Sequence, residues 1–223
     1  MFLESKYEEL LDRLSSEMNK AASKKKFEEA AKTRDQINAL GIIGSLTTSV
    51  SGLNQLEDLK NLLKLERIPQ RIEALDISNI YGKEACGSMV SFYKGEPDKN
   101  HYRRFRIKTV EGIDDYKMLA EVVKRRYSGS LKEDLTLPDL ILIDGGKSHL
   151  LIAKRELEKL GLKISLVSIA KDKENIYTQD KAYPIRLDAD TPALNLIRRI
   201  RNEAHRFALS YHHVLRRKKT IGK

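Results

Sequence analysis

Three aspartates and one histidine are the residues of this sequence whose types and positions best suit chemistry. Asp76 and Asp144 each stand at the end of an apolar run that is typical of a β-strand. Asp115 is the second of two aspartates that open a helical stretch, and His205 lies late in a long amphipathic pattern. A strand-end aspartate is often only a helix cap or a turn former. Four such groups in one α/β chain favour a common site instead, because ligands gather at the carboxyl ends of strands.

Carboxylates that converge at one edge of a sheet repel one another unless a divalent cation neutralises them. Hard oxygen ligands select Mg²⁺ or Mn²⁺ rather than zinc, and one imidazole is compatible with Mn²⁺. A Mg²⁺ or Mn²⁺ site set in a basic surface meets the physical requirement for cutting a phosphodiester bond. These residues therefore predict a metal-dependent phosphodiesterase, with Mg²⁺ or Mn²⁺ as its cofactor.

The elements that must position these groups begin with three β-like runs, over residues 71–78, 85–93 and 101–108. A turn at Tyr81–Glu84 and further short loops connect them, which predicts an antiparallel meander. In the third run, period-two alternation separates one strongly basic face from the other. The two sets are Tyr102, Arg104, Arg106 and Lys108 on one side and Arg103, Phe105 and Ile107 on the other. A helix is expected from Asp114-Asp115 to about Tyr127, with its acids at the favourable N-terminal end.

The second half of the body predicts parallel βα units. Leu140–Ile143 is a continuous apolar run followed by Asp-Gly-Gly-Lys and an amphipathic helix, the pattern of a buried central strand. Ser165–Ala170 is expected to be another such strand. Thr191-Pro192 reads as a cap and a first-turn proline, and the helix that follows continues to Tyr211. The expected fold class is α/β, with a mixed sheet flanked by helices.

The first 68 residues have a different pattern. Apolar positions three and four apart predict two helices within residues 1–40, joined as an antiparallel hairpin. Residues 41–52 are rich in Gly, Ser and Thr and are expected to form a flexible linker, followed by a lead-in helix over Leu53–Leu65. So short a hairpin buries little surface alone. It is expected to pair with another helical surface, the alternative being a decoration packed on its own main domain.

Composition narrows the class of protein. The chain has 223 residues and a net charge of +10, and its single cysteine excludes a disulfide framework or a multi-cysteine metal site. The whole charge excess falls outside residues 1–40, where eight basic and eight acidic residues balance. With no signal peptide or membrane-spanning run, the chain is expected to be soluble and cytoplasmic. The basic body suggests a nucleic-acid partner, although such a charge can also serve solubility alone.

The N-terminal helices resemble the UVR motif, the hairpin by which the repair proteins UvrB and UvrC bind one another. The resemblance rests on residues 18–40, which include Ala21-Ala22, Phe-Glu-Glu-Ala-Ala from Phe27, and Arg-Asp-Gln-Ile from Arg34. It implies that UvrB is a partner of this chain. The residues expected to make that contact are Phe27, Ala30, Ala31 and Arg34.

Residues 69–213 resemble the C-terminal endonuclease domain of the UvrC family, which has an RNase H-like fold. The matching motifs appear in the family's order: Arg71-Ile72-Glu73, Asp76-Ile77-Ser78-Asn79, Tyr102-Arg103-Arg104-Phe105, Gly112-Ile113-Asp114-Asp115-Tyr116, Leu137-Pro138-Asp139-Leu140, Asp144-Gly145-Gly146-Lys147 and Glu203-Ala204-His205-Arg206-Phe207. The family's domain cuts DNA on the 5′ side of a lesion that UvrB has marked. The resemblance implies metal-binding roles for Asp76, Asp144 and His205, and an additional active-site acid at Asp115.

The resemblance also makes double-stranded damaged DNA the expected substrate. The basic residues expected to contact it are Arg103, Arg104, Arg106, Lys147, Arg201 and Arg206, with a basic tail over residues 214–223. The chain has no counterpart of the family's GIY-YIG nuclease, its cysteine-rich segment or its helix–hairpin–helix clamp. Ser148-His149 stands where the family usually has Gly-Gln, and Asn202 stands where it usually has Asp.

Two other classes of function remain compatible with these residues. One is a catalytically silent adaptor that binds UvrB and DNA without cutting, which the missing clamp and the changes near the site would suit. The other is an RNase H-like nuclease that acts on RNA or branched DNA. The intact set of three aspartates and one histidine favours the DNA endonuclease.

Overall fold

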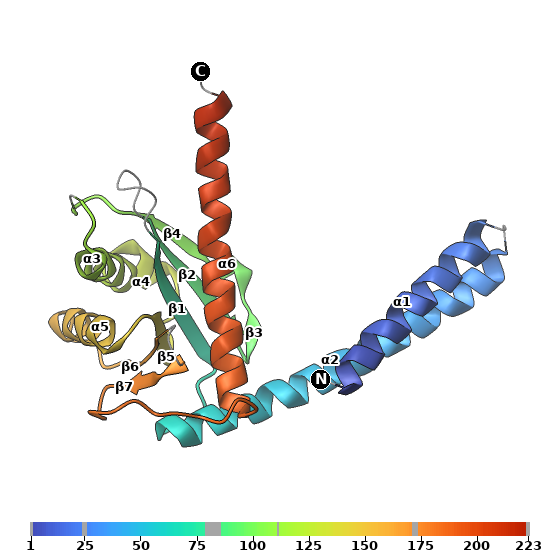
Figure 1. Cartoon of the computed structure of the whole chain (residues 1–223), viewed down its shortest axis with the longest axis horizontal. Coiled ribbons are helices and arrows are strands. Elements are labelled where there is room, and N and C mark those ends of the chain that lie inside the picture. The colour runs from blue at the N-terminus through green and yellow to red at the C-terminus, as the bar shows by residue number, and fades with distance from the viewer. Residues whose placement is uncertain (1, 24–25, 79–85, 111, 171–173, 222–223) are drawn as a thin grey trace. The chain divides into compact units, whose positions relative to one another are not determined.

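The computed structural model describes the backbone of residues 2–23, 26–78, 86–110, 112–170 and 174–221 (Figure 1). Within these ranges it leaves undescribed the side chains of residues 2–8, 11–12, 38–51, 78 and 211–221. The expected turn at Tyr81–Glu84 and the side chains of the basic tail therefore lie outside the described residues. The chain divides into two compact units, Met1–Ser51 and Gly52–Lys223.

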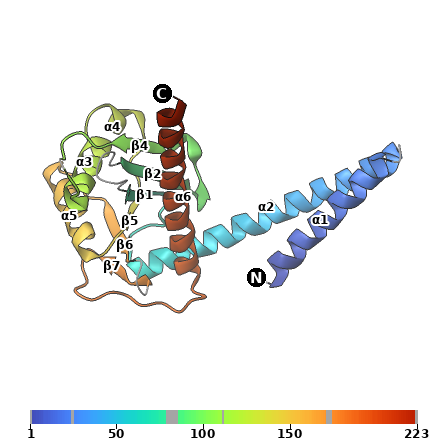
Figure 2. The ribbon, with the colours of Figure 1, turned by 45° about the horizontal axis from the view of Figure 1, so that its top comes forward.

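The N-terminal unit is a pair of antiparallel helices, as predicted. Helix α1 spans Phe2–Ser23 and runs alongside the first part of α2, which begins at Phe27 (Figures 1 and 2). The backbone N–H of Lys26 donates to the carbonyl of Ala21 at 3.0 Å, which ties the start of the second helix to the end of the first. Glu28 and Glu29 lie in the first turn of α2, where the helix dipole favours acidic side chains.

The predicted flexible linker is wrong in its secondary structure. Helix α2 does not end at Gly41 but continues without a break to Leu63, through the whole of residues 41–52. Glycine costs a helix only about 1 kcal/mol relative to alanine. Apolar residues at Ile43, Leu46 and Val50 keep a helical spacing across the stretch. That spacing outweighs a composition that, taken alone, is typical of a linker.

The C-terminal unit is built on a mixed sheet. Its strands are β1 (Arg71–Ser78), β2 (Cys86–Tyr93), β3 (Glu96–Pro97), β4 (Arg103–Arg106), β5 (Leu140–Asp144), β6 (Ser165–Ile169) and β7 (Ile176–Thr178). Over the described residues the order is β3-β2-β1-β5-β6-β7, and β4 also pairs with β2. The pairings of β1 with β2 and of β2 with β4 are antiparallel, which confirms the meander, while β1, β5 and β6 are parallel.

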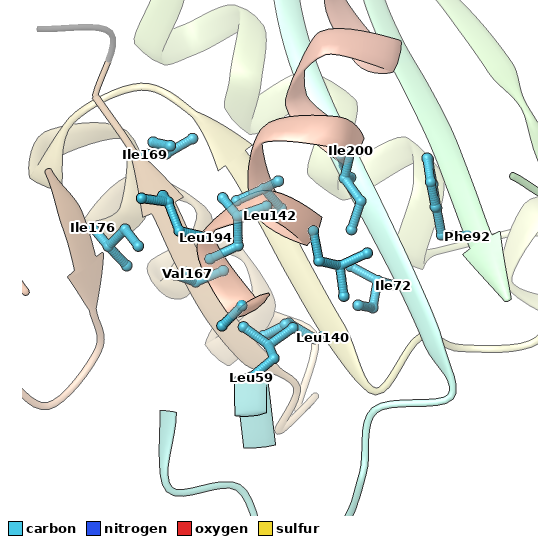
Figure 3. Close-up of a cluster of buried hydrophobic side chains, with 14 of the residues drawn as sticks. Leu59, Ile72, Phe92, Leu140, Leu142, Val167, Ile169, Ile176, Leu194 and Ile200 are labelled. Carbon is cyan, nitrogen blue, oxygen red and sulfur yellow. The ribbon is translucent and has the colours of Figure 1, made fainter. Parts of the chain in front are cut away.

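Helices cover both faces of the sheet and bury a hydrophobic core on each (Figure 1). One face packs against α6 (Pro192–Ile221) and the end of α2, where Leu56 and Leu59 are fully buried. Figure 3 shows part of this core, with Ile72 and Phe92 of the sheet on the side where Ile200 of α6 lies. The other face packs against α3 (Asp115–Tyr127) and α5 (Lys147–Lys159). This confirms an α/β fold with a mixed sheet flanked by helices.

The structure differs from the predicted elements mainly at the edges of the sheet. The third strand is shorter than the expected 101–108, because a 3₁₀ turn takes up Lys99–His101. Strands β3 and β7 and the short helix α4 (Ser130–Asp134) were not predicted, since two to five residues carry too little periodicity. The backbone of the expected tail is helical as far as Ile221. Among the described residues, no helix is long and apolar enough to cross a membrane.

A buried ion pair joins α3 to the central strand β1. The guanidinium of Arg126 donates to both carboxylate oxygens of Glu73, at 2.6 to 3.2 Å, and both side chains are fully buried. Tyr127 donates its hydroxyl to the same carboxylate at 2.8 Å. The remaining guanidinium protons reach the carbonyls of Leu131 and Thr136. Since every charged group is satisfied, the pair fixes the C-terminal end of α3 on the sheet.

Removing one partner of this pair should be strongly destabilising. Arg126→Met leaves the Glu73 carboxylate buried without its counter-charge, a change that typically costs about 3–5 kcal/mol of unfolding free energy. Urea denaturation measures the loss. The matched control Lys159→Met breaks an exposed ion pair with Glu156 and should change the unfolding free energy by less than about 0.5 kcal/mol. Equal effects in the two variants would contradict the anchoring role of Arg126.

Candidate functional site

Two of the predicted carboxylates meet at one end of the sheet because of strand register. Strands β1 and β5 pair in parallel, with Leu75 opposite Ile143, so that Asp76 and Asp144 follow side by side. Both belong to the set of alternating residues that faces α6, along with Ala74 and Leu142 of the core. Asp76 is buried, with 4% of its surface exposed, and Asp144 is half-buried. The parallel pairing therefore brings together two acids that are 68 residues apart in the sequence.

Helix α6 adds His205 to this pair. Its buried stripe, which includes Ile200, Ala204 and Ala208, lies on the sheet and leaves His205 at the margin. The imidazole Nδ1 lies 3.8 Å from Oδ2 of Asp76, and 47% of the histidine side chain is exposed. One ligand atom each from Asp76, Asp144 and His205 lie within 4.8 Å of one another. The structure thus brings together three of the four residues that the sequence singled out.

The donor set of this cluster fits a divalent cation. Two carboxylates and one imidazole at this spacing can share one ion, and a buried carboxylate beside a second one is costly without a positive charge. Oxygen donors of this kind are the ligands of Mg²⁺ and Mn²⁺, whereas the cysteine ligands typical of structural zinc sites are missing from the cluster. The cluster is open to solvent on the side of His205.

Asp115, which is among the described residues, lies outside that three-residue cluster. It is the first residue of α3, and Asp114 before it caps the helix by accepting from the backbone N–H of Lys117 at 3.0 Å. Helix α3 starts at the same end of the sheet as the cluster, because β4 runs parallel to β1 before it. The ring of Tyr116 contacts that of His149, with centroids 4.8 Å apart. This contact links the start of α3 to the first turn of α5.

Two sets of contacts hold the His205 segment of α6 against the sheet edge. Tyr102 donates its hydroxyl to Glu203 at 3.0 Å, and Arg206 donates to the same carboxylate. These bonds, the one from Arg206 above all, hold the pKa of Glu203 below its ordinary value despite partial burial. Arg104 stacks over the ring of Phe207, 4.3 Å from its centroid, and bonds the hydroxyl of Ser210 at 2.7 Å.

The six basic residues expected to contact DNA differ in their surroundings. Arg104 and Arg206 make the α6 contacts described above. Arg103 donates to the carbonyls of Asn100 and Tyr102, Lys147 donates to the carbonyl of Ala182, and Arg201 lies 3.6 Å from Glu174. Arg106 is exposed, and its guanidinium has no partner among the described residues. The predicted alternation on β4 is confirmed, since Phe105 is buried between exposed Arg104 and Arg106.

The predicted partner-binding residues lie near the start of α2. Phe27 is 68% exposed, a large value for an aromatic side chain, while Ala30 and Ala31 are half-buried. Arg34 is exposed and pairs with the neighbouring Asp35. The exposed Phe27 ring is therefore accessible to a second helical surface.

Glu121 belongs to the stretch that resembles the family, but the sequence assigned it no role. Its side chain is 6% exposed and accepts from the backbone N–H groups of Lys108 and Thr109 and from the Thr109 hydroxyl, at 2.7 to 3.1 Å. Arg125 donates to it as well, at 3.0 Å. Glu121 therefore fastens the segment that leads from β4 to Asp115. The sequence places Glu121 on the apolar face of the helix that Asp115 opens. An acidic side chain on a buried face needs hydrogen-bond partners, and this could have predicted its role.

Family models match this chain in two places. The model of the UvrB/uvrC motif matches residues 8–42, and the model of the UvrC RNase H endonuclease domain matches residues 60–209. The sheet, its flanking helices and this match define the C-terminal unit as an RNase H-like endonuclease domain. Since the match extends over most of the chain, the chain belongs to the UvrC family.

Curated relatives are called UvrABC system protein C. One from Dehalococcoides mccartyi is 49% identical over 195 residues, which are 85% of this chain and 32% of the relative. One from Methanococcus maripaludis is 52% identical over 167 residues, 75% of this chain and 32% of the relative. The chain thus spans about a third of the length of these relatives.

Solved structures of endonuclease V are similar at a greater distance. The Ciona intestinalis enzyme in complex with a DNA containing inosine has a TM-score of 0.36 and 12% identity, covering 59% of this chain and 58% of that one. The catalytic domain of human endonuclease V has a TM-score of 0.35 and 19% identity, covering 52% and 49%.

The Glu121 network predicts a specific pH dependence of stability. Burial raises the pKa of Glu121, but the hydrogen bonds from Thr109, Lys108 and Arg125 outweigh it and hold the pKa below the ordinary value of 4.5. A depressed folded-state pKa stabilises the fold above the unfolded-state pKa, and this contribution is lost as the pH falls through the folded-state value.

Glu121→Gln should therefore lower the unfolding free energy by about 1.5–3 kcal/mol at pH 7, the range for hydrogen bonds to charged groups. The difference from the wild type should shrink as the pH falls below 4.5 and through the lower pKa of the folded state, where the wild-type Glu121 carboxylate takes up its proton. Denaturation at several pH values measures it. A difference that stays constant with pH would contradict the assignment, and exposed Glu158→Gln serves as the control.

Proposed function

We propose that this chain is a metal-dependent DNA endonuclease of nucleotide excision repair that cuts on the 5′ side of a lesion held in a UvrB–DNA complex. One observation carries the proposal. Asp76, Asp144 and His205, from two central strands and the last helix, place ligand atoms within 4.8 Å of one another at the end of an RNase H-like sheet. The endonuclease family match and the relatives named for the UvrABC system support it.

In this proposal the two aspartates and the histidine hold Mg²⁺ or Mn²⁺. The ion, when bound, polarises the phosphate, lowers the pKa of water and stabilises the leaving oxygen. Asp76 and Asp144 supply the hard oxygen donors and are fixed by the sheet, so that they need not rearrange as the substrate binds. His205 lies at the exposed margin, where it adjoins solvent and incoming DNA.

Asp115 acts in this proposal as an additional active-site acid. It is exposed at the start of α3, at the same end of the sheet as the cluster. The Glu121 network and the contact between Tyr116 and His149 hold this end of α3 in place. A carboxylate on a helix that is anchored at both ends can meet DNA at the site without a large entropic cost.

We propose that the DNA backbone lies over the exposed basic groups around this end of the sheet. Arg106 is the best placed, since its guanidinium is exposed and not engaged by any described residue. Arg103, Lys147 and Arg201 would exchange contacts with carbonyls or Glu174 for contacts with phosphate. Arg104 contacts α6 from β4, and Arg206 pairs with Glu203 within α6, so phosphate binding at either would add to a structural role.

An incision assay on a lesion-containing duplex tests the function. The duplex carries one bulky lesion, is already nicked on the 3′ side and is supplied with UvrB and Mg²⁺ or Mn²⁺. The wild-type chain should cut the damaged strand on the 5′ side and should lose activity when a chelator is added. Asp76→Asn and Asp144→Asn should each lower the rate by about 100-fold or more, because each removes a metal ligand. Their DNA affinity should stay equal or rise, since a negative charge is lost.

The control Asp134→Asn removes the same charge from an exposed position on α4 and should leave the rate unchanged. DNA and UvrB binding without any cutting would favour the silent adaptor. Cutting of an RNA strand or a branched DNA in preference to the damaged duplex would favour an RNase H-like nuclease with another nucleic-acid substrate. Full activity in either aspartate variant would overturn the metal site.

The hairpin is proposed to recruit the chain to UvrB. Phe27→Ala should weaken binding to UvrB by about 2 kcal/mol, roughly 30-fold, because a buried aromatic anchor carries much of a small interface. The fold should be unaffected, since Phe27 is 68% exposed. Calorimetry with UvrB measures the affinity, and Lys32→Ala on the exposed side of the same helix is the control. Unchanged binding after deletion of residues 1–40 would refute the hairpin's role.

A further inference from the structure

A buried serine lies directly beside Asp76 in the sheet. Strands β1 and β2 pair antiparallel with Asp76 opposite Ser88, so the two side chains lie on the same face. That face is the one covered by α6, as shown by Ile72 and Phe92, which belong to the same alternating set (Figure 3). Side chains of directly opposite residues have Cβ atoms about 4.5–5.5 Å apart. The Ser88 hydroxyl is therefore within reach of the Asp76 carboxylate, either directly or through one water molecule.

The Ser88 hydroxyl has no hydrogen-bond partner among the described residues, although the residue is only 1% exposed. Buried hydroxyls in folded proteins are nearly always bonded, because an unbonded one loses its hydration without compensation. Alanine or valine at a buried strand position would avoid the free-energy cost of burying a hydroxyl. A buried, unbonded hydroxyl beside a site carboxylate thus points to a role that the fold alone does not require.

The neighbours of Ser88 leave Asp76 as the natural acceptor. On its other side, Ser88 lies opposite Arg104 of β4, which bears only donors and is held over Phe207. Along its own face of β2, Val90 is apolar, and the thiol of Cys86, a weak acceptor, donates to the carbonyl of Gly87. The carboxylate of Asp76 offers lone pairs beyond those that a single metal bond would use.

We infer that Ser88 is a positioning residue of the metal site, which donates its hydroxyl proton to the Asp76 carboxylate, directly or through one water, and orients it toward the ion. This inference rests on the proposed metal-dependent function. Residues that hold a metal ligand in place typically contribute 10–100-fold to metal affinity. The role differs from a structural one, because it predicts weaker metal binding without a loss of fold stability.

Mn²⁺ binding to the full chain, without DNA, tests the inference. Electron paramagnetic resonance of free Mn²⁺ gives the affinity, and thermal melting in chelator gives the stability of the metal-free fold. Ser88→Ala should weaken Mn²⁺ binding by about 10–100-fold. Its melting temperature in chelator should be unchanged or higher, because in the metal-free fold the buried Ser88 hydroxyl has no partner among the described residues. Ser88→Thr keeps the hydroxyl and should lose less affinity than the roughly 10-fold lower end of that range.

Ser91 provides the matched control on the same strand. It is fully buried, lies on the opposite face, and its hydroxyl accepts from Arg71 at 2.8 Å. Ser91→Ala should lower the melting temperature and leave Mn²⁺ affinity unchanged, which is the pattern of a purely structural serine.

The outcomes separate this inference from the proposed function. If Asp76→Asn abolishes Mn²⁺ binding while Ser88→Ala binds as tightly as the wild type, the role of Ser88 is wrong and the metal site stands. If Ser88→Ala lowers the melting temperature in chelator as well as the Mn²⁺ affinity, the serine is structural and the inference is also wrong. If the wild type binds no Mn²⁺, or Asp76→Asn binds it normally, the metal site itself is wrong.

Discussion

The parallel pairing of β1 with β5 is the constraint on which the candidate site depends. With Leu75 opposite Ile143, the next residues of both strands are aspartates, and both face α6. Any slip of one residue would turn one carboxylate toward the other core. The register is secured because both strands are central and carry apolar side chains into a core on each face. Hydrophobic burial thereby sets a geometry that electrostatic repulsion alone would oppose.

Polar contacts then fix the helices relative to this pair of strands. The buried pair of Glu73 and Arg126 anchors the end of α3 on β1, and Glu121 fastens the segment before its start. On the other face, Arg104 and Phe207 clamp α6 so that His205 stays beside Asp76. Several arginines that sequence reasoning assigned to DNA therefore serve the protein itself. The basic character of this domain is partly structural, and the surface left for phosphate is smaller than the composition suggests.

Much of the site could be predicted from sequence, because its helices and strands are long or have clear start and end residues. The apolar run before Asp144, the acidic start of α3 and Thr191-Pro192 before α6 each have a local physical signature. What escaped prediction depends on partners distant in sequence. The helical course of residues 41–52 overrides their composition, and the short edge strands exist only because β2 and β6 offer them hydrogen bonds. The place of Ser88 opposite Asp76 follows from strand register, which no local pattern fixes.

The central claim is that one divalent ion binds between the ends of β1 and β5, against α6. Anomalous diffraction from crystals of this chain soaked in Mn²⁺ tests it most directly, because it locates the ion without reference to activity. We expect a strong peak within bonding distance of carboxylate oxygens of both Asp76 and Asp144 and of the imidazole of His205. A peak elsewhere, with none between these three side chains at saturating Mn²⁺, would contradict it.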